Sequence, residues 1–225
     1  MLFNSFLFMF IFLPATLIGY HLLNCSKINI TYSLTFLGIA SLVFYGYWEL
    51  YFLWVIGLSI IGNYAFGLWI GNPLITAKIR KIALILAISC NLLTLIIYKY
   101  LDFFITVFNK LLHLHMPTLS LVLPLGISFF TFTQIAYLVD VFSERVKEKN
   151  IIKYALFVTY FPHLIAGPIL HHSEMLPQFS NKNKKDFSLD QIVLGLTIFS
   201  IGLFKKVVIA DECAWIAEPI FTAVH

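Results

Sequence analysis

The stretch LYFLWVIGLSIIGNYAFGLWI, from Leu50 to Ile70, contains no charged residue and is long enough to cross a lipid bilayer as a helix. About 20 apolar residues in helical form span the roughly 30 Å of hydrocarbon in a membrane. The apolar character continues on both sides, because Lys27 and Glu49 are the only Lys, Arg, Asp or Glu residues up to Ala77. The sequence therefore predicts an all-α, polytopic membrane protein.

The overall composition agrees with this class of protein. Hydrophobic residues make up 60% of the chain and charged residues 12%, against roughly 45–50% and 25% in soluble domains. The net charge of +4 comes from basic residues scattered between apolar segments, as the positive-inside bias predicts, so we expect no nucleic-acid partner. The three cysteines, Cys25, Cys90 and Cys213, are too few and too widely spaced for a disulfide framework or a zinc site.

The apolar runs indicate about six to seven membrane segments in a single membrane domain, residues 1–225. The first is expected to be retained, because no positive charge precedes it as in a signal peptide. The expected segments are Leu2–Leu23, Thr31–Tyr47, Leu50–Ile70, Ile82–Tyr98, Leu119–Phe142, a broken segment Ile151–Leu170, and Gln191–Ala210.

The segment between Lys99 and Pro117 has a different pattern, with polar residues three or four positions apart. On a helix these residues form one narrow polar stripe: Lys99, Asp102, Thr106, Asn109, Lys110 and His113. The pattern predicts an interfacial amphipathic helix, with the stripe turned to water or lipid headgroups. The alternative is a spanning helix whose stripe faces the interior of the bundle.

Basic residues favour an N-terminus outside the cytoplasm. In that orientation the inner loops hold Lys27, then the group from Lys78 to Lys81, then the group from Arg145 to Lys149. The basic loop 182–185 also prefers the inside, which conflicts with a full crossing by Ile151–Leu170. Pro162 and the Gly167–Pro168 pair interrupt that segment, so we expect it to be re-entrant or tilted and to line a polar cavity.

Three longer motifs carry a family resemblance: LVLPLGISFFTFTQIAYLVDVF (Leu121–Phe142), FPHLIAGPILHHSEMLPQF (Phe161–Phe179) and GLFKKVVIAD (Gly202–Asp211). The chain resembles the membrane-bound O-acyltransferase superfamily, in particular the bacterial branch that acetylates alginate, peptidoglycan and other cell-surface polysaccharides. The resemblance implies transfer of an acyl, and by expectation an acetyl, group from a cytoplasmic donor such as acetyl-CoA or an acyl carrier. It also implies the bacterial inner membrane, a polysaccharide acceptor and a periplasmic or extracellular acetyl-transfer partner protein.

The essential histidine of the superfamily follows a tryptophan, and that Trp-His motif is missing here. The four tryptophans are Trp48, Trp54, Trp69 and Trp215, and none precedes a histidine. The resemblance thus implies the N-terminal half of an acyltransferase, with no catalytic residue, no activity alone and a separate C-terminal half as a candidate partner. A non-catalytic scaffold or the remnant of a truncated gene is one alternative, and a transporter component is another.

The remaining polar residues supply candidates for binding rather than catalysis. The adjacent histidines His171 and His172 point about 100° apart on a helix, so they cannot both face one substrate. A metal site would need several converging ligands with a recognisable spacing, and we expect none. Asp140 is expected to lie at a solvated helix end. The positive charges of Lys205 and Lys206 could attract an anionic donor, snorkel to headgroups or pair with Asp211. The candidates for lining the cavity or binding substrate are His163, Gly167, Pro168, His171, His172, Glu174 and Gln134.

Overall fold

The computed structural model describes residues 1–25, 30–146, 150–165, 175, 178–179 and 188–222. Every regular element in these ranges is a helix, which confirms the all-α class. The chain divides into two compact units. One comprises Met1–Leu22 and Lys182–His225, and the other comprises Leu23–Asn181.

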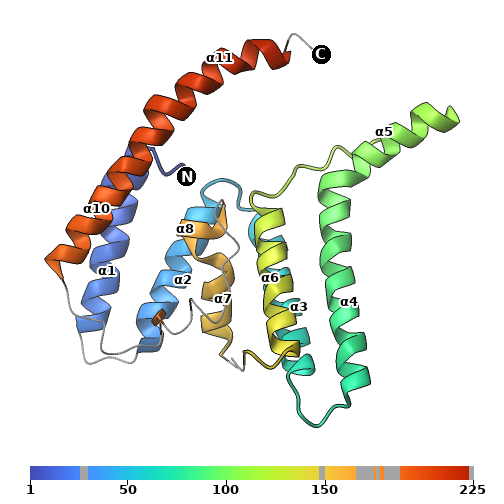
Figure 1. Cartoon of the computed structure of the whole chain (residues 1–225), viewed down its shortest axis with the longest axis horizontal. Helices are drawn as coiled ribbons and strands as arrows, with labels where there is room; N and C mark the ends of the chain where they lie inside the picture. The colour runs from blue at the N-terminus through green and yellow to red at the C-terminus, as the bar shows by residue number, and fades with distance from the viewer. Residues whose placement is uncertain (26–29, 147–149, 166–174, 176–177, 180–187, 223–225) are drawn as a thin grey trace. The chain divides into compact units, whose positions relative to one another are not determined.

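The larger unit is a helical bundle (Figure 1). The helix α3 packs against α4 and α6, and α2 packs against α7 and the short α8. The core between α3, α6 and α7 is aromatic, with the rings of Tyr137 and Tyr154 centred 4.4 Å apart. The bounds are α2 Ile30–Gly46, α3 Phe52–Ile70, α4 Ala77–Leu95, α5 Leu101–Leu112, α6 Ile127–Phe142, α7 Ile151–Thr159 and α8 Phe161–Leu164.

Three helices are long and apolar enough to cross a membrane: Phe52–Ile70, Ala77–Leu112 and Leu189–Thr222. Shorter apolar helices cover Phe8–Asn24, Ile30–Gly46 and Ile127–Phe142. These helices support an integral membrane protein. The number of membrane segments, six to seven, remains a prediction. The second of the three contains α4, the π-helix η2 (Ile96–Tyr100) and α5 in succession.

The helix expected over Leu119–Phe142 begins eight residues later, at Ile127. Its N-cap, Gly126, has a φ of +70°, a conformation that glycine adopts without a steric penalty. A Cβ at position 126 would lie 2.6 Å from the carbonyl oxygen of Leu164. The close approach of α8 to this turn therefore requires the glycine. Because the helix begins only after Gly126, the apolar residues before it are not helical.

The interruption expected after Ile151 is confirmed up to Ile165. The helix α7 ends at Thr159, Tyr160 has an extended ψ of 109°, and α8 restarts at Phe161 with Pro162 in its first turn. Proline at position 162 has no N–H to donate to the carbonyl of Val158, so a continuous helix would lose this bond. The re-entrant course of Ile151–Leu170 remains a prediction, because residues 166–170 lie outside the described ranges.

In the smaller unit, η1 (Phe8–Phe12) leads into α1 (Leu13–Cys25), and the ring of Phe8 lies 6.5 Å from that of Phe199 in α10. The expected helix Gln191–Ala210 is longer on both sides. It consists of α10 (Leu189–Phe204), the π-helix η4 (Lys205–Ala210) and α11 (Asp211–Thr222). The Lys205–Lys206 pair thus lies inside a continuous helix rather than near its end.

Candidate functional site

Gln134, a candidate from the sequence, is fully buried at the centre of a polar chain that connects three helices. Its side-chain Nε2 donates to Ser59 Oγ of α3 at 2.9 Å. Its Oε1 accepts a hydrogen bond from the hydroxyl of Tyr154 in α7 at 3.0 Å. Both ends of the amide are therefore satisfied inside an apolar bundle, where an unpaired polar group would be costly.

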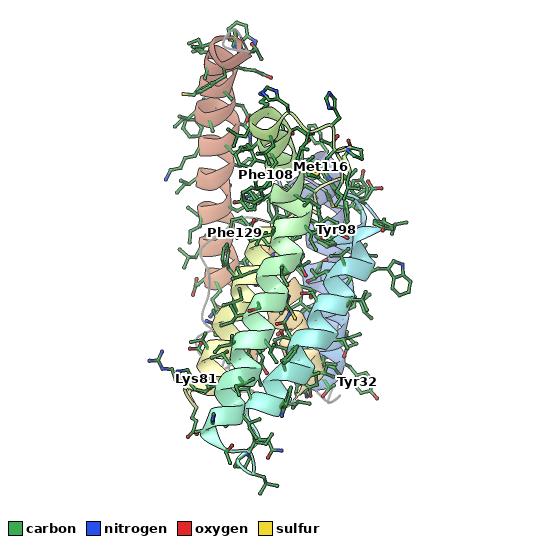
Figure 2. All side chains as sticks on the ribbon, turned by 90° about the vertical axis from the view of Figure 1, so that its right-hand side faces the viewer. Tyr32, Lys81, Tyr98, Phe108, Met116 and Phe129 are labelled. Carbon is green, nitrogen blue, oxygen red and sulfur yellow. The ribbon has the colours of Figure 1, made fainter. Side chains whose placement is uncertain are left out.

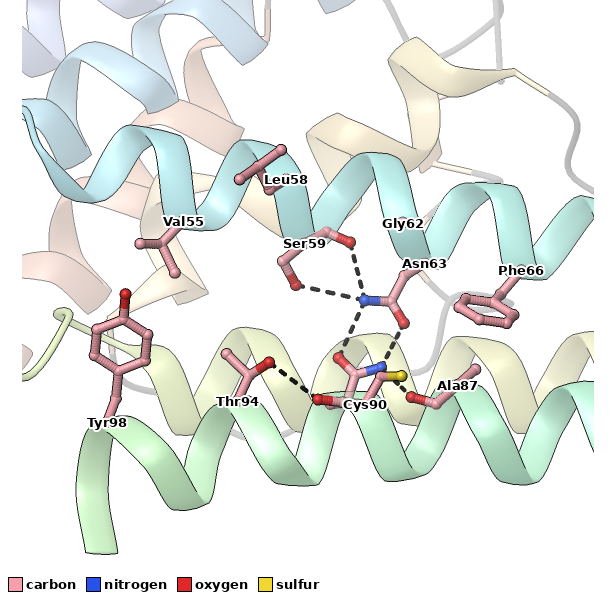
Figure 3. Close-up of a pocket in the computed structure, with 11 residues that line it drawn as sticks. Val55, Leu58, Ser59, Gly62, Asn63, Phe66, Ala87, Cys90, Thr94 and Tyr98 are labelled. Carbon is pink, nitrogen blue, oxygen red and sulfur yellow. Dashed lines mark hydrogen bonds between the residues drawn. The ribbon is translucent and has the colours of Figure 1, made fainter. Parts of the chain in front are cut away.

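The same polar chain reaches α4 through two asparagines (Figure 3). Asn63 Nδ2 donates to the backbone oxygen of Ser59 at 2.9 Å and to Asn91 Oδ1 at 3.1 Å. In return, Asn91 Nδ2 donates to Asn63 Oδ1 at 2.6 Å. The chain Tyr154–Gln134–Ser59–Asn63–Asn91 thus crosses from α7 through α6 and α3 to α4.

A cavity of about 350 Å³ lies beside this chain, between α3 and α4. Figure 3 shows Asn63 in it, with the ring of Tyr98 at one end, and Asn91 also lines the cavity. A few polar side chains in an otherwise apolar cavity can orient a polar ligand. The lining residues are Val55, Leu58, Ser59, Gly62, Asn63, Phe66, Ala87, Cys90, Asn91, Thr94 and Tyr98.

His163 lies in α8, and both of its ring nitrogens are buried without a hydrogen-bond partner among the described residues. The ring of Tyr160 is centred 5.7 Å away and that of Phe157 6.5 Å away. The backbone of Phe157 is close enough to act on the imidazole electrostatically, but no hydrogen bond of ordinary geometry forms. The hydrogen-bonded partners of Gln134 are Ser59 and Tyr154, so the described residues do not join His163 to the polar chain.

Five other candidates, Gly167, Pro168, His171, His172 and Glu174, lie outside the described residues. Within the described part of the chain, no three His, Cys, Asp or Glu residues come together as metal ligands would.

The two candidate lysines differ in their surroundings, although both are exposed. Lys206 forms an ion pair with Asp211, as one of the sequence alternatives predicted. The pair depends on the π-helix, because residues five apart on an α-helix point about 140° away from each other. The wider turn is visible in the bond from the backbone N–H of Asp211 to the carbonyl of Lys206.

Asp140 does not lie at a solvated helix end, so that expectation is wrong. Its side chain is buried, and Oδ1 lies 3.8 Å from Arg145 Nη1. The chain turns back directly after α6, where the backbone N–H of Arg145 donates to the carbonyl of Asp140. This turn brings the guanidinium within ion-pair distance of the buried carboxylate.

Sequence reasoning missed Ser59, Asn63, Asn91 and Tyr154. Ser59 and Asn63 are four positions apart, so they lie on one face of α3. Uncharged polar residues within an apolar run, spaced by one helical turn, are the signal that could have found them, because polar groups in membrane helices favour contacts with other helices.

Known proteins resemble the chain over nearly its whole length. It is 44% identical to the peptidoglycan O-acetyltransferase of Helicobacter pylori over 97% of the chain and 46% of that protein. It is 35% identical to a probable alginate O-acetylase of Pseudomonas aeruginosa and 34% identical to one of Azotobacter vinelandii, over 98% of the chain in each case. These matches cover 42% and 44% of the two proteins, so the chain spans less than half the length of these curated relatives.

The sequence profile of MBOAT, the membrane-bound O-acyltransferase family, matches residues 127–224. No solved structure matches the chain significantly. The matched range begins with α6 and includes α7, α8 and the long helix formed by α10, η4 and α11. The resemblance seen in the three motifs is therefore confirmed: residues 127–224 match the membrane-bound O-acyltransferase family, and curated relatives match along nearly the whole chain.

Proposed function

We propose that the chain is part of an O-acetyltransferase of the bacterial inner membrane that modifies hydroxyls of a cell-surface polysaccharide. The observation that carries the proposal is similarity along nearly the whole chain to proteins named for O-acetylation of peptidoglycan or alginate. In the proposed enzyme the acetyl group comes from a cytoplasmic donor such as acetyl-CoA or an acyl carrier. The N-terminus lies outside, and a periplasmic or extracellular protein is a candidate partner for passing the acetyl group on.

The bundle's contribution is to form a wall with polar groups at defined depths. The chain from Tyr154 to Asn91 supplies such groups across α7, α6, α3 and α4. The bend between α7 and α8 supplies His163, whose nitrogens lack partners among the described residues. In this proposal His163 and Gln134 line the path of the substrate or the donor, and neither performs the chemical step.

We further propose that a polypeptide of these 225 residues is inactive alone. Its tryptophans at positions 48, 54, 69 and 215 are followed by Glu49, Val55, Ile70 and Ile216, so no Trp-His pair is present. Activity would then need the part of the enzyme that carries this pair, in the same polypeptide or in a second one.

A chimaera tests both proposals. The 225 residues replace the matched part of the Helicobacter pylori relative in cells that lack that protein, and the O-acetyl content of the peptidoglycan is measured by mass spectrometry. We expect O-acetylation from the chimaera and none from the 225-residue chain expressed alone. A chimaera that reaches the membrane at the normal level but leaves peptidoglycan unmodified would contradict the acceptor class, and acetylation by the chain alone would contradict its inactivity.

A further inference from the structure

Two residues in the polar stripe of α5 bind a later segment of the chain itself. Asn109 makes a reciprocal pair of hydrogen bonds with the backbone of Met116, with Nδ2 donating to the carbonyl at 2.8 Å and Oδ1 accepting from the N–H at 3.0 Å. Asp102 Oδ1 accepts from the backbone N–H of Leu119 at 2.8 Å. Residues 113–123, the return segment, therefore run back along α5 and form a hairpin with it.

The turn of the hairpin is set by His113, which ends α5 in the left-handed conformation with φ of 52°. Asp102, Thr106, Asn109 and His113 are spaced by four, three and four positions, so they share one face of the helix. The return segment is bonded to that face at Asp102 and Asn109, while Thr106 and His113 remain exposed. Both components of the hairpin also present large apolar side chains outward.

Large hydrophobic side chains are exposed on the helix and on the return segment alike. No residue of α5 is buried. Figure 2 shows Phe108 and Met116, one from each component, among the side chains of this part of the chain. The exposed residues are Phe103, Phe104, Phe108, Leu111 and Leu112 of α5, and Leu114, Met116, Leu119, Leu121, Val122 and Leu123 of the return segment.

The position of the hairpin on a membrane helix indicates what covers this surface. Ala77–Leu112 is a continuous helix of 36 residues, about 54 Å long at 1.5 Å per residue, whereas the hydrocarbon core is only about 30 Å thick. The excess begins where the π-helix η2 interrupts the α-helical register, and α5 turns away from α4 at that point (Figure 1). A helix that has already crossed the bilayer thus delivers the hairpin to the membrane boundary.

Backbone chemistry sets the depth of the hairpin. Of the return segment, Met116 and Leu119 have their N–H groups satisfied by side chains of α5. Other backbone groups of this irregular segment need partners, and the hydrocarbon core offers none. The headgroup and ester region offers water and lipid oxygens, and apolar side chains can insert from there into the acyl chains.

We propose that α5 and the return segment together form a lipid-binding hairpin, embedded at the boundary between headgroups and acyl chains in the leaflet where α4 ends. Both components insert apolar side chains into lipid, and Asn109 and Asp102 hold the return segment in place. This differs from a surface helix with its whole polar stripe in water, because here Asp102 and Asn109 of the stripe bind the second component of the lipid-binding surface.

Spin labels on the chain in phospholipid vesicles test this arrangement. Single cysteines are placed at Leu111 and at Val122, each 70% exposed, and at Leu74, a 91% exposed residue of the loop before α4, with Cys25, Cys90 and Cys213 changed to serine. Collision rates with oxygen, which enters lipid, and with a water-soluble nickel chelate are measured at each site. We expect the oxygen-to-nickel ratio at Leu111 and Val122 to exceed the ratio at Leu74 several-fold.

Two other results would overturn the proposal. A ratio at both hairpin sites equal to that at Leu74 would place the hairpin in water. Low collision rates with both reagents would mean that protein, from another segment or a second copy, covers the surface.

Asn109→Leu tests the role of the amide while keeping a side chain of similar size. The variant leaves the N–H and carbonyl of Met116 without their partner, so we expect the return segment to move toward water and the ratio at Val122 to fall. The neighbouring change Lys110→Gln alters an exposed residue that takes no part in the hydrogen bonds of Asp102 and Asn109 to the return segment, and it should leave the ratio unchanged. An unchanged ratio in Asn109→Leu would show that Asn109 does not hold the return segment.

Discussion

Asn63 and Asn91 exchange hydrogen bonds across the interface of α3 and α4, at 3.1 Å in one direction and 2.6 Å in the other. Both side chains are buried. Amide groups between membrane helices pair because neither lipid nor apolar side chains can replace the lost bonds. This pair fixes the register of α3 against α4 and forms one wall of the cavity shown in Figure 3.

Replacing both of these asparagines should cost less than the two single replacements added together. Asn63→Leu leaves the amide of Asn91 without its partner across the interface, and we expect a loss of roughly 0.5–2 kcal/mol in the free energy of unfolding. The variant with leucine at both positions should lose less than the sum of the two single changes. Thermal unfolding in detergent gives these values, with Cys90→Ser, an exposed neighbour of Asn91, as the control. Strictly additive losses would mean that the pair does not couple the helices.

Gly126 should be intolerant of a side chain. Gly126→Ala places a Cβ 2.6 Å from the Leu164 carbonyl oxygen at a φ of +70°, and the strained backbone alone costs about 1–3 kcal/mol. The control is Gly57→Ala in α3, where no atom lies within 4 Å of the added Cβ and a helix gains roughly 0.5–1 kcal/mol from the change. Equal unfolding temperatures of the two variants would contradict the close approach of α8 to this turn.

Arg80 should stabilise the bundle more than its exposed ion pair suggests. Its guanidinium donates to Glu144 Oε1 at 2.9 Å, to the carbonyl of Ile70 at 2.7 Å and to that of Phe142 at 3.3 Å. Arg80→Leu removes bonds to the ends of both α3 and α6, and we expect a loss of about 1–3 kcal/mol. Glu144 is 67% exposed, so Glu144→Gln should cost at most about 1 kcal/mol.

Urea or thermal unfolding of the two variants in detergent separates the contribution of the Arg80–Glu144 ion pair from that of the two bonds to backbone carbonyls. High salt should weaken the Arg80–Glu144 pair without affecting the two bonds to carbonyls, because salt screens exposed charges more than it screens partly buried dipoles. Equal losses for the two variants would show that the carbonyl contacts contribute little.

The two lysines of η4 should contribute unequally to binding of the acetyl donor. Asp211 offsets the charge of Lys206, whereas Lys205 has no ion-pair partner among the described residues. In the chimaera, Lys205→Gln should therefore raise the KM for an anionic donor more than Lys206→Gln does. Asp211→Asn should lower that KM, because it frees the charge of Lys206. KM values that do not respond to any of these changes, or to salt, would exclude attraction of the donor by this pair.

His163→Gln should leave folding nearly unchanged. Neither ring nitrogen has a hydrogen-bond partner among the described residues, so no bond with them is lost, and we expect a change of less than about 1 kcal/mol in stability. The measurement is the yield and the elution profile of the variant in detergent. A large loss of monodisperse protein would show that the imidazole has a structural partner.

The sequence predicts the fold class and most helices, because long apolar runs leave few alternatives to membrane helices. The prediction from sequence is less accurate where the backbone conformation of a single residue decides where a helix begins. Leu119–Gly126 has a helical apolar pattern, yet Gly126 adopts a left-handed conformation next to Leu164, a contact distant in sequence. The predicted span Gln191–Ala210 likewise included Lys205 and Lys206 but did not extend to Thr222, where the helix ends.

The candidate site is predicted only in part, for a physical reason. Gln134 stands out as an amide in an apolar run, and the structure places it in the buried polar chain. Its partners Ser59 and Tyr154 are 75 and 20 positions away, and helical periodicity carries no information about which helices become neighbours. The stripe of α5 was visible in the sequence, but its binding to the backbone of Met116 and Leu119 depends on the turn at His113.

The most direct test of the proposed function is acetyl transfer by the purified chimaera in lipid nanodiscs, measured as labelled acetyl groups passed from an acetyl thioester to soluble peptidoglycan fragments. We expect transfer above the uncatalysed rate with the chimaera, and none when its Trp-His histidine, contributed by the relative, is changed to alanine. Transfer that is absent from a folded, membrane-inserted chimaera while the unaltered relative is active would contradict the claim that this chain forms part of an O-acetyltransferase.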